Sequence, residues 1–293
     1  SFLHLQPLMS VITNIDKDHL ENHKNSFDFL KKNFIEFVNN LPFYGLCLLN
    51  ISDINTKSII PKISRPIKTF GFDTDSDFIA FPKDLNNIPA IFDYKENDKI
   101  YEIQFNMPGE HNVLNCLAAI AVSRELGISI KSIQKSLKNF PGIKRRFEVL
   151  GSYKTKGKSF MWIDDYGHHP TEIKQVLRTI KEVWKEKNIT MIFQPHRYSR
   201  TAEHFNYFID VLKSVDNLIL MDIYSANEKT IDNISSDVIA SEIKKFNKNV
   251  LLINDHLEIA NYVNNNIKDN DILLTMGAGS IAKFINYYKD SIS

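Results

Sequence analysis

Six short apolar runs alternate with segments of helical spacing after residue 143, and this alternation constrains the fold more than any other feature of the sequence. The runs, in chain order, are FEVLGSY, FMWIDDY, TMIFQP, NLILMDIY, NVLLI and DILLTMG. A helix is expected to follow each of the last five runs, beginning near Pro170, Ala202, Ile234, Leu257 and Ser280. Strands that alternate with helices in this way predict βαβ units, and hence a doubly wound α/β sheet.

The first half of the chain is less regular. A β-branched run, MSVITNI, precedes residues 26–41, whose apolar side chains recur with the spacing of one helix face. Five short runs separated by Asp, Asn and Pro predict a mixed sheet with an antiparallel part; they are YGLCLLNIS, TFGF, FIAF, AIFDY and KIYEIQF. Helices over 111–127 and near 129–139 then lead to a Pro-Gly pair. We therefore place a domain boundary there, between 1–142 and 143–293.

Length and charge limit the classes of function. The 293 residues are enough for about two domains with substantial cores. The formal net charge of +1, from 36 basic and 35 acidic residues, gives no global field to attract nucleic acid or anionic lipid. We therefore expect no nucleic-acid partner, and an anionic substrate must be held by local basic groups. The sequence carries no signal of oligomeric state.

Membrane insertion and disulfide bonding are also not expected. Apolar stretches such as VLNCLAAIAV, residues 113–122, end well short of the roughly 18 residues that a membrane span needs. Cys47 and Cys116 are far apart in apolar surroundings, so they support neither a disulfide framework nor a thiolate zinc site. A reducing cytoplasm fits this pattern. The opening SFLHLQPL resembles neither an initiator segment nor a signal peptide, so we expect the true N-terminus to lie upstream.

The segment GSYKTKGKS, residues 151–159, is one residue longer than a phosphate-binding loop of the form G-x-x-x-x-G-K-[ST]. Such a loop works because it leaves a strand and opens a helix, so that backbone N–H groups converge on the phosphates. Here the segment joins two strand-like runs instead. A basic β-hairpin turn is therefore the favoured interpretation.

Polar side chains follow three of the predicted strands of the second half. In DDYGHHPTE, residues 164–172, two carboxylates, a phenol and two imidazoles precede a helix opened by Pro170 and Thr171. This group is interpreted either as a site or as a satisfied polar strand end. HRYSR, residues 196–200, supplies two guanidiniums, which suit carboxylate or phosphate unless they form a solvated face. GAGS, residues 277–280, is a weak match to a dinucleotide fingerprint and favours a tight strand-to-helix turn.

Five segments in order and at the right spacing resemble the Mur ligase family. They are ITNIDKDH (12–19), PGEHNVLNCLAA (108–119), FPGIKRRFEVLG (140–151), DDYGHHPTE and FQPHRYSRT (193–201). The resemblance implies a partial central ATPase-type α/β domain, truncated at its N-terminal side, followed by a Rossmann-like doubly wound α/β domain. It also implies that a UDP-sugar domain, the phosphate loop and a magnesium-binding glutamate lie upstream of Ser1. We accordingly expect this chain alone to be inactive.

The resemblance implies an ATP-dependent amide ligase of peptidoglycan precursor synthesis, acting in the cytoplasm. The combination of DDYGHHP with QPHR is most similar to members that add L-alanine to UDP-N-acetylmuramate. In that chemistry ATP phosphorylates the muramoyl carboxylate, and the amine of L-alanine then attacks the acyl phosphate. Each stage gathers anions, so catalysis depends mainly on positioning and on charge stabilisation. ATP and Mg2+ are the implied cofactors.

The resemblance also implies roles for residues of the first half. His19 would ligate magnesium near the muramoyl carboxylate, its alternative being a strand-end cap together with Asp18. Three residues at one helix start would read adenine: His111, Asn112 and Asn115. Glu21 and Cys116 depart from the commoner Asp and Ala of the family, which affects the expected local geometry and not the family assignment.

In the second half the implied roles concern nucleotide and substrates. Arg146 would reach the ATP phosphates across the domain boundary, and Asp164 or Asp165 would take the ribose hydroxyls. Four residues would line the pocket for L-alanine and the muramoyl group: Tyr166, His168, Arg197 and Arg200. The sequence does not decide between the two aspartates, nor among L-alanine, serine and glycine.

Two other classes of function remain open at this point. A metal-dependent phosphoesterase would use a different set of residues: Asp164, Asp165, His168 and His169. It would also be expected to place carboxylates at further strand ends, and VITNI and MIFQP end without them. The other alternative is a non-catalytic nucleotide-binding or assembly fragment.

Overall fold

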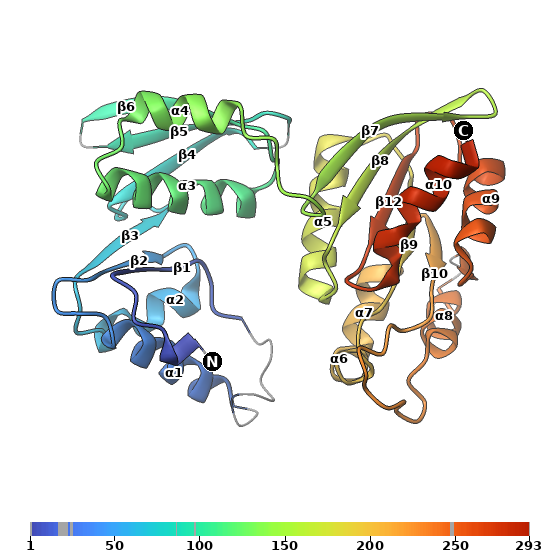
Figure 1. Cartoon of the computed structure of the whole chain (residues 1–293), viewed down its shortest axis with the longest axis horizontal. Helices are drawn as coiled ribbons and strands as arrows, with labels where there is room; N and C mark the ends of the chain where they lie inside the picture. Colours follow the sequence, from blue (N-terminus) through green and yellow to red (C-terminus); the bar gives the residue numbers. More distant parts are fainter. Residues whose placement is uncertain are drawn as a thin grey trace. The chain divides into compact units, whose positions relative to one another are not determined.

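A computed structural model describes residues 2–16, 23, 26–85, 87–96, 98–246 and 249–292 of the chain. The chain divides into two compact units, Ser1–Pro141 and Gly142–Ser293. Each unit is built on its own six-stranded sheet (Figure 1). The fold is therefore mixed α/β in both units, as the sequence predicts.

The first sheet is parallel on one side and antiparallel on the other. Its strands are β1 (Met9–Ile12), β2 (Leu46–Asn50), β3 (Ile67–Gly71), β4 (Phe78–Asp84), β5 (Ala90–Glu96) and β6 (Lys99–Phe105). They lie in sequence order, with parallel pairs from β1 to β4 and antiparallel pairs from β4 to β6. The prediction of a mixed sheet with an antiparallel part is confirmed.

Helices cover both faces of this sheet. They are α1 (Phe27–Asn39), α2 (Ile54–Ile59), α3 (Glu110–Glu125) and α4 (Ile130–Lys138), with 3-10 turns η1 (Phe2–His4) and η3 (Ile60–Lys62). One core cluster contains α3 and α4 side chains, and another contains α1 and α2 side chains. The sequence did not predict α2, because six residues are too few for a periodic pattern, although its cap is clear: the Asp53 carboxylate accepts from Thr56 N at 2.7 Å.

The second sheet has five parallel strands and one antiparallel edge strand. The strands are β7 (Glu148–Thr155), β8 (Lys158–Asp165), β9 (Ile189–Phe193), β10 (Asn217–Leu220), β11 (Asn249–Leu252) and β12 (Ile272–Met276). Their order is β11-β10-β9-β12-β8-β7, and only the β7–β8 pair is antiparallel. Because β12 lies between β8 and β9, Met276 pairs with both Asp165 and Phe193. The carboxyl ends of these three strands therefore meet at one edge.

The helices of the second unit lie on both faces of its sheet. They are α5 (Pro170–Val183), α6 (Tyr198–Glu203), α7 (Phe205–Leu212), α8 (Ser236–Lys244), α9 (His256–Asn266), η4 (Ser280–Lys283) and α10 (Phe284–Ile292). Apolar residues of α5, α7 and α8 share one core cluster, and those of α9 and α10 share another. The doubly wound prediction is confirmed. The helix expected from Ala202 was placed wrongly: it begins four residues earlier, as α6, and breaks at His204 before α7.

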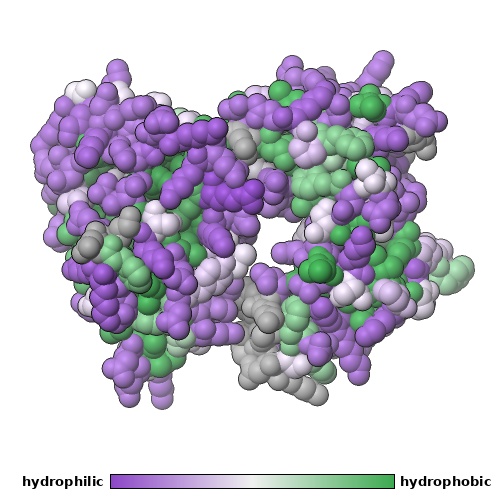
Figure 2. Space-filling view, turned by 180° about the vertical axis from the view of Figure 1, so that it is seen from behind, coloured by the Kyte–Doolittle hydropathy of each residue, from purple (hydrophilic) through white to green (hydrophobic). Residues whose placement is uncertain are grey.

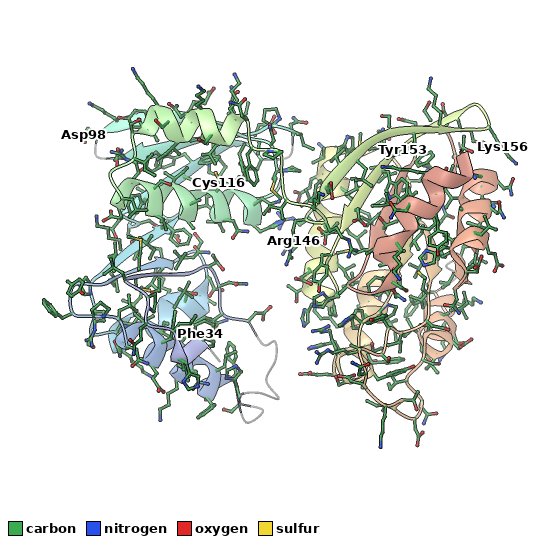
Figure 3. All side chains as sticks on the ribbon, viewed as in Figure 1. Phe34, Asp98, Cys116, Arg146, Tyr153 and Lys156 are labelled. Carbon is green, nitrogen blue, oxygen red and sulfur yellow. The ribbon has the colours of Figure 1, made fainter. Side chains whose placement is uncertain are left out.

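Both cysteines are buried in the first unit. Cys47 lies on β2 and Cys116 on α3, and Figure 3 labels Cys116 there. Burial raises the pKa of the Cys47 thiol to about 11 and raises that of Cys116 further.

The surface of the second unit that Figure 2 shows is mostly hydrophilic. Among the described residues, no helix has both the length and the apolar character that crossing a membrane requires.

The KTKGKS segment forms the turn of the β7–β8 hairpin, so this prediction is confirmed. Thr155 pairs with Lys158, and Lys156 and Gly157 between them have φ of 47° and 79°. Two consecutive left-handed residues are typical of a tight two-residue hairpin turn. Figure 3 labels Lys156 at this turn. The Lys158 ammonium donates to Asn265 O at 3.4 Å, and no helix follows the turn.

Candidate functional site

Polar side chains gather at the carboxyl-terminal edge of the second sheet. They come from the loops that follow β8, β9 and β12, and from the residues just before β7. In doubly wound sheets ligands bind at this edge, because the loops that leave it diverge and helix N-termini point toward it. The structure thus brings most of the predicted residues of the second half into one region.

Asp164, at the end of β8, forms a buried ion pair with Arg145. Its side chain is 1% exposed; one carboxylate oxygen accepts from Arg145 Nε at 2.9 Å and the other from Thr275 Oγ at 2.6 Å. Thr275 in turn accepts from Trp162 Nε1 at 3.0 Å. Burial raises the pKa of Asp164, opposed by these two partners. The carboxylate thus links β8, β12 and the segment before β7.

Asp165 is held by backbone N–H groups. Its two oxygens accept from Phe147 N at 2.7 Å and from Gly167 N at 2.6 Å, and its side chain is 5% exposed. Burial raises the pKa of this carboxyl to about 6, although both hydrogen bonds favour the charged form. The Asp165 carboxylate therefore connects the loop after β8 to the residue just before β7.

Tyr166 presents its ring to two guanidiniums. The ring centroid lies 5.5 Å from the Arg145 guanidinium carbon and 5.6 Å from that of Arg146. Tyr166 N also donates to Arg145 O at 2.6 Å. Arg146, labelled in Figure 3, is exposed, and its Nη1 lies 3.7 Å from Glu172 Oε1. The phenol ring thus fixes the direction of two cationic side chains at the edge of the site.

The N-terminus of α5 is capped from both sides. Thr171 N donates to His169 Nδ1 at 3.3 Å, and Glu172 Oε2 accepts from His168 N at 2.9 Å and from His169 N at 3.1 Å. Burial disfavours the charged Glu172 carboxylate, but these N–H donors outweigh it and lower its pKa. This reciprocal arrangement is a capping box with histidine as the cap residue. It holds the His168 backbone at the helix start.

The loop after β9 places Arg200 and His196 together. Arg200 is 8% exposed, and its Nη1 lies 3.3 Å from both His196 Nδ1 and His196 O. The His196 ring stacks on Tyr224 with centroids 5.4 Å apart. Burial lowers the pKa of His196 to about 4, helped by His168 and Arg200. The imidazole therefore stays neutral at pH 7.

Arg197 occupies a strained backbone position at the start of α6. Its φ is 73°, in the left-handed region that side chains rarely adopt, and its N–H donates to Tyr224 O at 2.8 Å. Its Nη1 lies 3.7 Å from Glu228 Oε1, and Glu228 also accepts from Ser199 N and Oγ at 3.0 and 2.7 Å. This backbone conformation places the Arg197 guanidinium beside the Glu228 carboxylate, which Ser199 holds in position.

The GAGS segment after β12 is a tight turn, as predicted. A Cβ on Gly277 would lie 2.5 Å from Gln194 O, and one on Gly279 would lie 2.4 Å from Gln194 Oε1. Gly277 O accepts from Arg145 Nη2 at 2.6 Å. The glycines therefore permit close approach of backbone and side chains within the protein.

Four side chains from two loops make one polar surface. The Tyr166 and His168 rings lie 5.3 Å apart edge to face, the His168 and His196 rings 5.7 Å apart, and His196 contacts Arg200. Arg197 lies beside this row on the same loop as Arg200. Together with Arg197, these side chains supply a phenol, two imidazoles and two guanidiniums, which suit the recognition of a carboxylate or phosphate.

The predicted residues of the first half lie in the first unit. His111, Asn112 and Asn115 belong to the first turns of α3, where Asn112 is buried and Asn115 is exposed. The Asn112 amide donates to Pro108 O at 2.8 Å, so one of its two N–H groups is used within the chain. His19 and its neighbours Asp18 and Glu21 lie outside the described residues.

No group of three or more His, Cys, Asp or Glu side chains within the described ranges is placed to hold a metal ion. The four residues that a phosphoesterase would use at the end of β8 therefore do not form such a group. The Asp164 and Asp165 oxygens there contact an arginine, a threonine and backbone N–H groups instead.

Two family models match the chain in succession. Residues 1–123 match the Mur ligase middle domain, and residues 145–279 match the Mur ligase, glutamate ligase domain. The chain belongs to the Mur ligase family.

Curated relatives of this Mur ligase chain align along nearly all of it. It is 40% identical over 291 residues to the UDP-N-acetylmuramate–L-alanine ligase of Hydrogenovibrio crunogenus, covering 99% of this chain and 63% of the relative. It is 42% identical over 284 residues to the enzyme of the same name from Vesicomyosocius okutanii, covering 96% and 61%. The chain thus spans somewhat over three fifths of the length of these relatives.

Solved Mur ligase structures share the fold. The UDP-N-acetylmuramate-alanine ligase of Thermotoga maritima superposes with a TM-score of 0.75 at 27% identity, covering 99% of this chain and 60% of that one. A murein peptide ligase of Psychrobacter arcticus superposes with a TM-score of 0.68 at 21% identity, covering 99% and 58%. The second likeness concerns the fold alone.

Sequence patterns do not single out several residues of this candidate site. Arg145 was overlooked beside Arg146, although the β7–β8 hairpin places it near the end of β8. Thr275 and Glu228 come from distant segments, and neither has a local signal that would have found it. His196 belongs to the HRYSR motif, but the motif alone points to its two arginines and not to this ring.

Proposed function

We propose that this chain supplies the central and C-terminal domains of an ATP-dependent amide ligase that adds L-alanine to UDP-N-acetylmuramate. In this proposal residues 1–142 are the central ATP-binding domain, and residues 143–293 are the Rossmann-like domain that takes the amino acid. The observation that carries it is the cluster of two guanidiniums, a phenol and two imidazoles at one strand edge. The alignment with relatives of that name along nearly the whole chain supports the substrate assignment.

The reaction joins a carboxylate to an amine at the expense of ATP. The muramoyl carboxylate takes the γ-phosphoryl group, which leaves ADP, and the amine of L-alanine attacks the acyl carbon. The tetrahedral intermediate expels phosphate and the nitrogen loses a proton, which leaves an amide. Anionic groups are present at each stage, so basic side chains that hold them in line account for much of the catalysis.

The substrate roles fall on four of the side chains at this strand edge: Tyr166, His168, Arg197 and Arg200. Arg200 is the better placed to clamp a carboxylate, because its buried guanidinium is already oriented by His196 and pays little entropy on binding. Arg197 is more exposed and releases its contact with Glu228, which is 3.7 Å long, more readily. His168 and Tyr166 contribute hydrogen-bonding edges beside them.

The nucleotide roles fall on residues of both units. His111, Asn112 and Asn115 read adenine at the start of α3; one N–H of the Asn112 amide donates to Pro108 O, and its second N–H and its carbonyl oxygen are the groups proposed to meet the base. Arg146 holds phosphates, since it is exposed and carries a permanent charge. His19 is proposed as a magnesium ligand from its motif alone.

The ribose assignment favours Asp165 over Asp164. Each oxygen of both carboxylates accepts one donor within the chain and keeps a second lone pair. Asp164, however, is 1% exposed and already paired with the Arg145 guanidinium, whereas Asp165 is 5% exposed and its two donors are backbone N–H groups. Asp164 then serves to hold the strand ends in place.

The test is an assay of phosphate release from ATP by the product of the complete gene. Release should require both UDP-N-acetylmuramate and L-alanine, and omission of either should reduce it to background. The product should carry the mass of the added alanine. Release that is indifferent to both substrates, or that follows another amino acid and not L-alanine, contradicts the proposal.

A further inference from the structure

Two histidines from different loops meet beside the candidate site. His169 Nε2 and His204 Nε2 lie 3.1 Å apart, and the rings stand edge to face with centroids 4.4 Å apart. His169 is 7% exposed and is the N-cap residue of α5, whereas His204 lies between α6 and α7. The residues proposed above to bind the substrates and the nucleotide do not include this pair.

The hydrogen bonds of His169 determine the protonation of both rings. Thr171 N donates to His169 Nδ1 at 3.3 Å, so Nδ1 carries a lone pair and the ring proton is on Nε2. That proton points to His204 Nε2, which must accept it, so the His204 proton is on Nδ1. Glu203 Oε2 lies 3.9 Å from His204 Nε2, which is beyond hydrogen-bond distance. The pair therefore consists of two neutral rings of opposite tautomer.

The two histidines connect the halves of the site. On one side, His169 caps α5 together with Glu172, which accepts from His168 N at 2.9 Å. On the other side, His204 N donates to Arg200 O at 3.1 Å, so His204 is fixed to the last turn of α6. A shift of His204 would therefore move the α5 start relative to α6, and with it His168 relative to Arg200.

We propose that His204 is a positioning residue, which sets the separation of His168 and Arg200 by accepting a hydrogen bond from His169. This inference rests on the function proposed above. It adds a residue that makes none of the contacts assigned to substrate or nucleotide. Displacement of catalytic groups by about 1 Å can cost about 100-fold in rate, so loss of this hydrogen bond is expected to lower turnover although neither ring contacts the substrate.

The tautomers are tested first, by nitrogen-15 NMR of the imidazoles in the 293-residue chain at pH 7.5. The expected spectrum has His169 protonated at Nε2 and His204 protonated at Nδ1, each with a single set of shifts. His204→Ala should change the His169 ring signals. Protonation of His204 at Nε2, or averaged signals for either ring, would overturn the proposal without reference to activity.

Kinetics in the complete gene product then test positioning. His204→Ala should lower kcat/KM for L-alanine about tenfold or more, while His204→Gln, whose side-chain oxygen can accept from His169, should recover most of the loss. Glu203→Ala is the matched control and should leave the kinetics unchanged. Equal losses in the alanine and glutamine variants, or no loss in either, would overturn the proposal. If the parent protein shows no turnover that depends on L-alanine, the proposed function fails, and the tautomer measurement still decides the pairing.

Discussion

The Arg145 guanidinium and the Asp164 carboxylate form an ion pair of 2.9 Å in which the carboxylate side chain is 1% exposed. Arg145→Ala would leave that carboxylate buried beside Thr275 alone. We expect a loss of about 3 kcal/mol in the free energy of unfolding, because a buried charge without its partner is costly. Urea denaturation provides the measurement.

The control for this pair is Arg178→Ala. Arg178 and Glu182 form a pair of 2.7 Å, but their side chains are 51% and 34% exposed, so the loss should be about 0.5 kcal/mol or less. Equal losses in the two variants would show that burial does not set the strength of the Arg145 pair.

Arg200→Lys and Arg197→Lys test the proposed clamp. Each keeps the charge but loses the planar fork, so kcat/KM for L-alanine should fall about tenfold or more. The loss should be greater at Arg200, since its guanidinium is buried and already contacts His196. Steady-state kinetics of the complete gene product decide the matter; unchanged values for both variants would remove these arginines from the site.

The His196 imidazole should titrate far below an ordinary histidine. Burial lowers its pKa to about 4, with His168, Arg200 and Arg197 adding positive charge nearby and Glu228 opposing them. Since the native pKa lies below that of the unfolded chain, about 6.5, its contribution to stability is complete above pH 6.5 and is lost as the pH falls toward 4.

Proton NMR of the His196 ring would give the midpoint of this titration directly. Arg200→Gln should raise that midpoint only in part, because burial remains the larger cause. A midpoint near 6.5 in the parent protein would contradict the burial argument.

Lys158→Ala should leave ATP affinity nearly unchanged, because this lysine belongs to the hairpin turn. Arg146→Ala is the matched comparison: a second basic residue of the same unit, placed at the opposite end of the strand pair and proposed to hold phosphates. Calorimetric titration with ATP should show a clear loss of ATP affinity in Arg146→Ala and almost none in Lys158→Ala. A large loss at Lys158 with the fold intact would make KTKGKS a phosphate-binding segment after all.

The βαβ order and the edge that carries the site were predictable because they rest on local signals. Strand runs, the Pro170 helix start and the hairpin turn in KTKGKS each report on neighbours in sequence. Failures occurred where tertiary contacts decide. The break between α6 and α7 falls at His204, whose ring contacts His169, thirty-five positions away.

The same limit applies to the site. Its motifs named the residues at the strand ends, but they did not show that Asp164 and Asp165 are both buried and hydrogen-bonded within the chain. Both aspartates are buried because Arg145 and Phe147, just before β7, contact them at the end of β8. Hairpin register is a non-local property, and no periodic pattern contains it.

The two buried thiols give the chain a practical advantage for spectroscopy. Alkylating reagents react with thiolates, and both Cys47 and Cys116 are shielded and have raised pKa values. A cysteine placed at Lys156 would then be the one readily alkylated, with no need to replace the native pair. Since β8 spans eight residues, about 23 Å, a fluorophore at that turn would sit well away from the site at the other end of the strand.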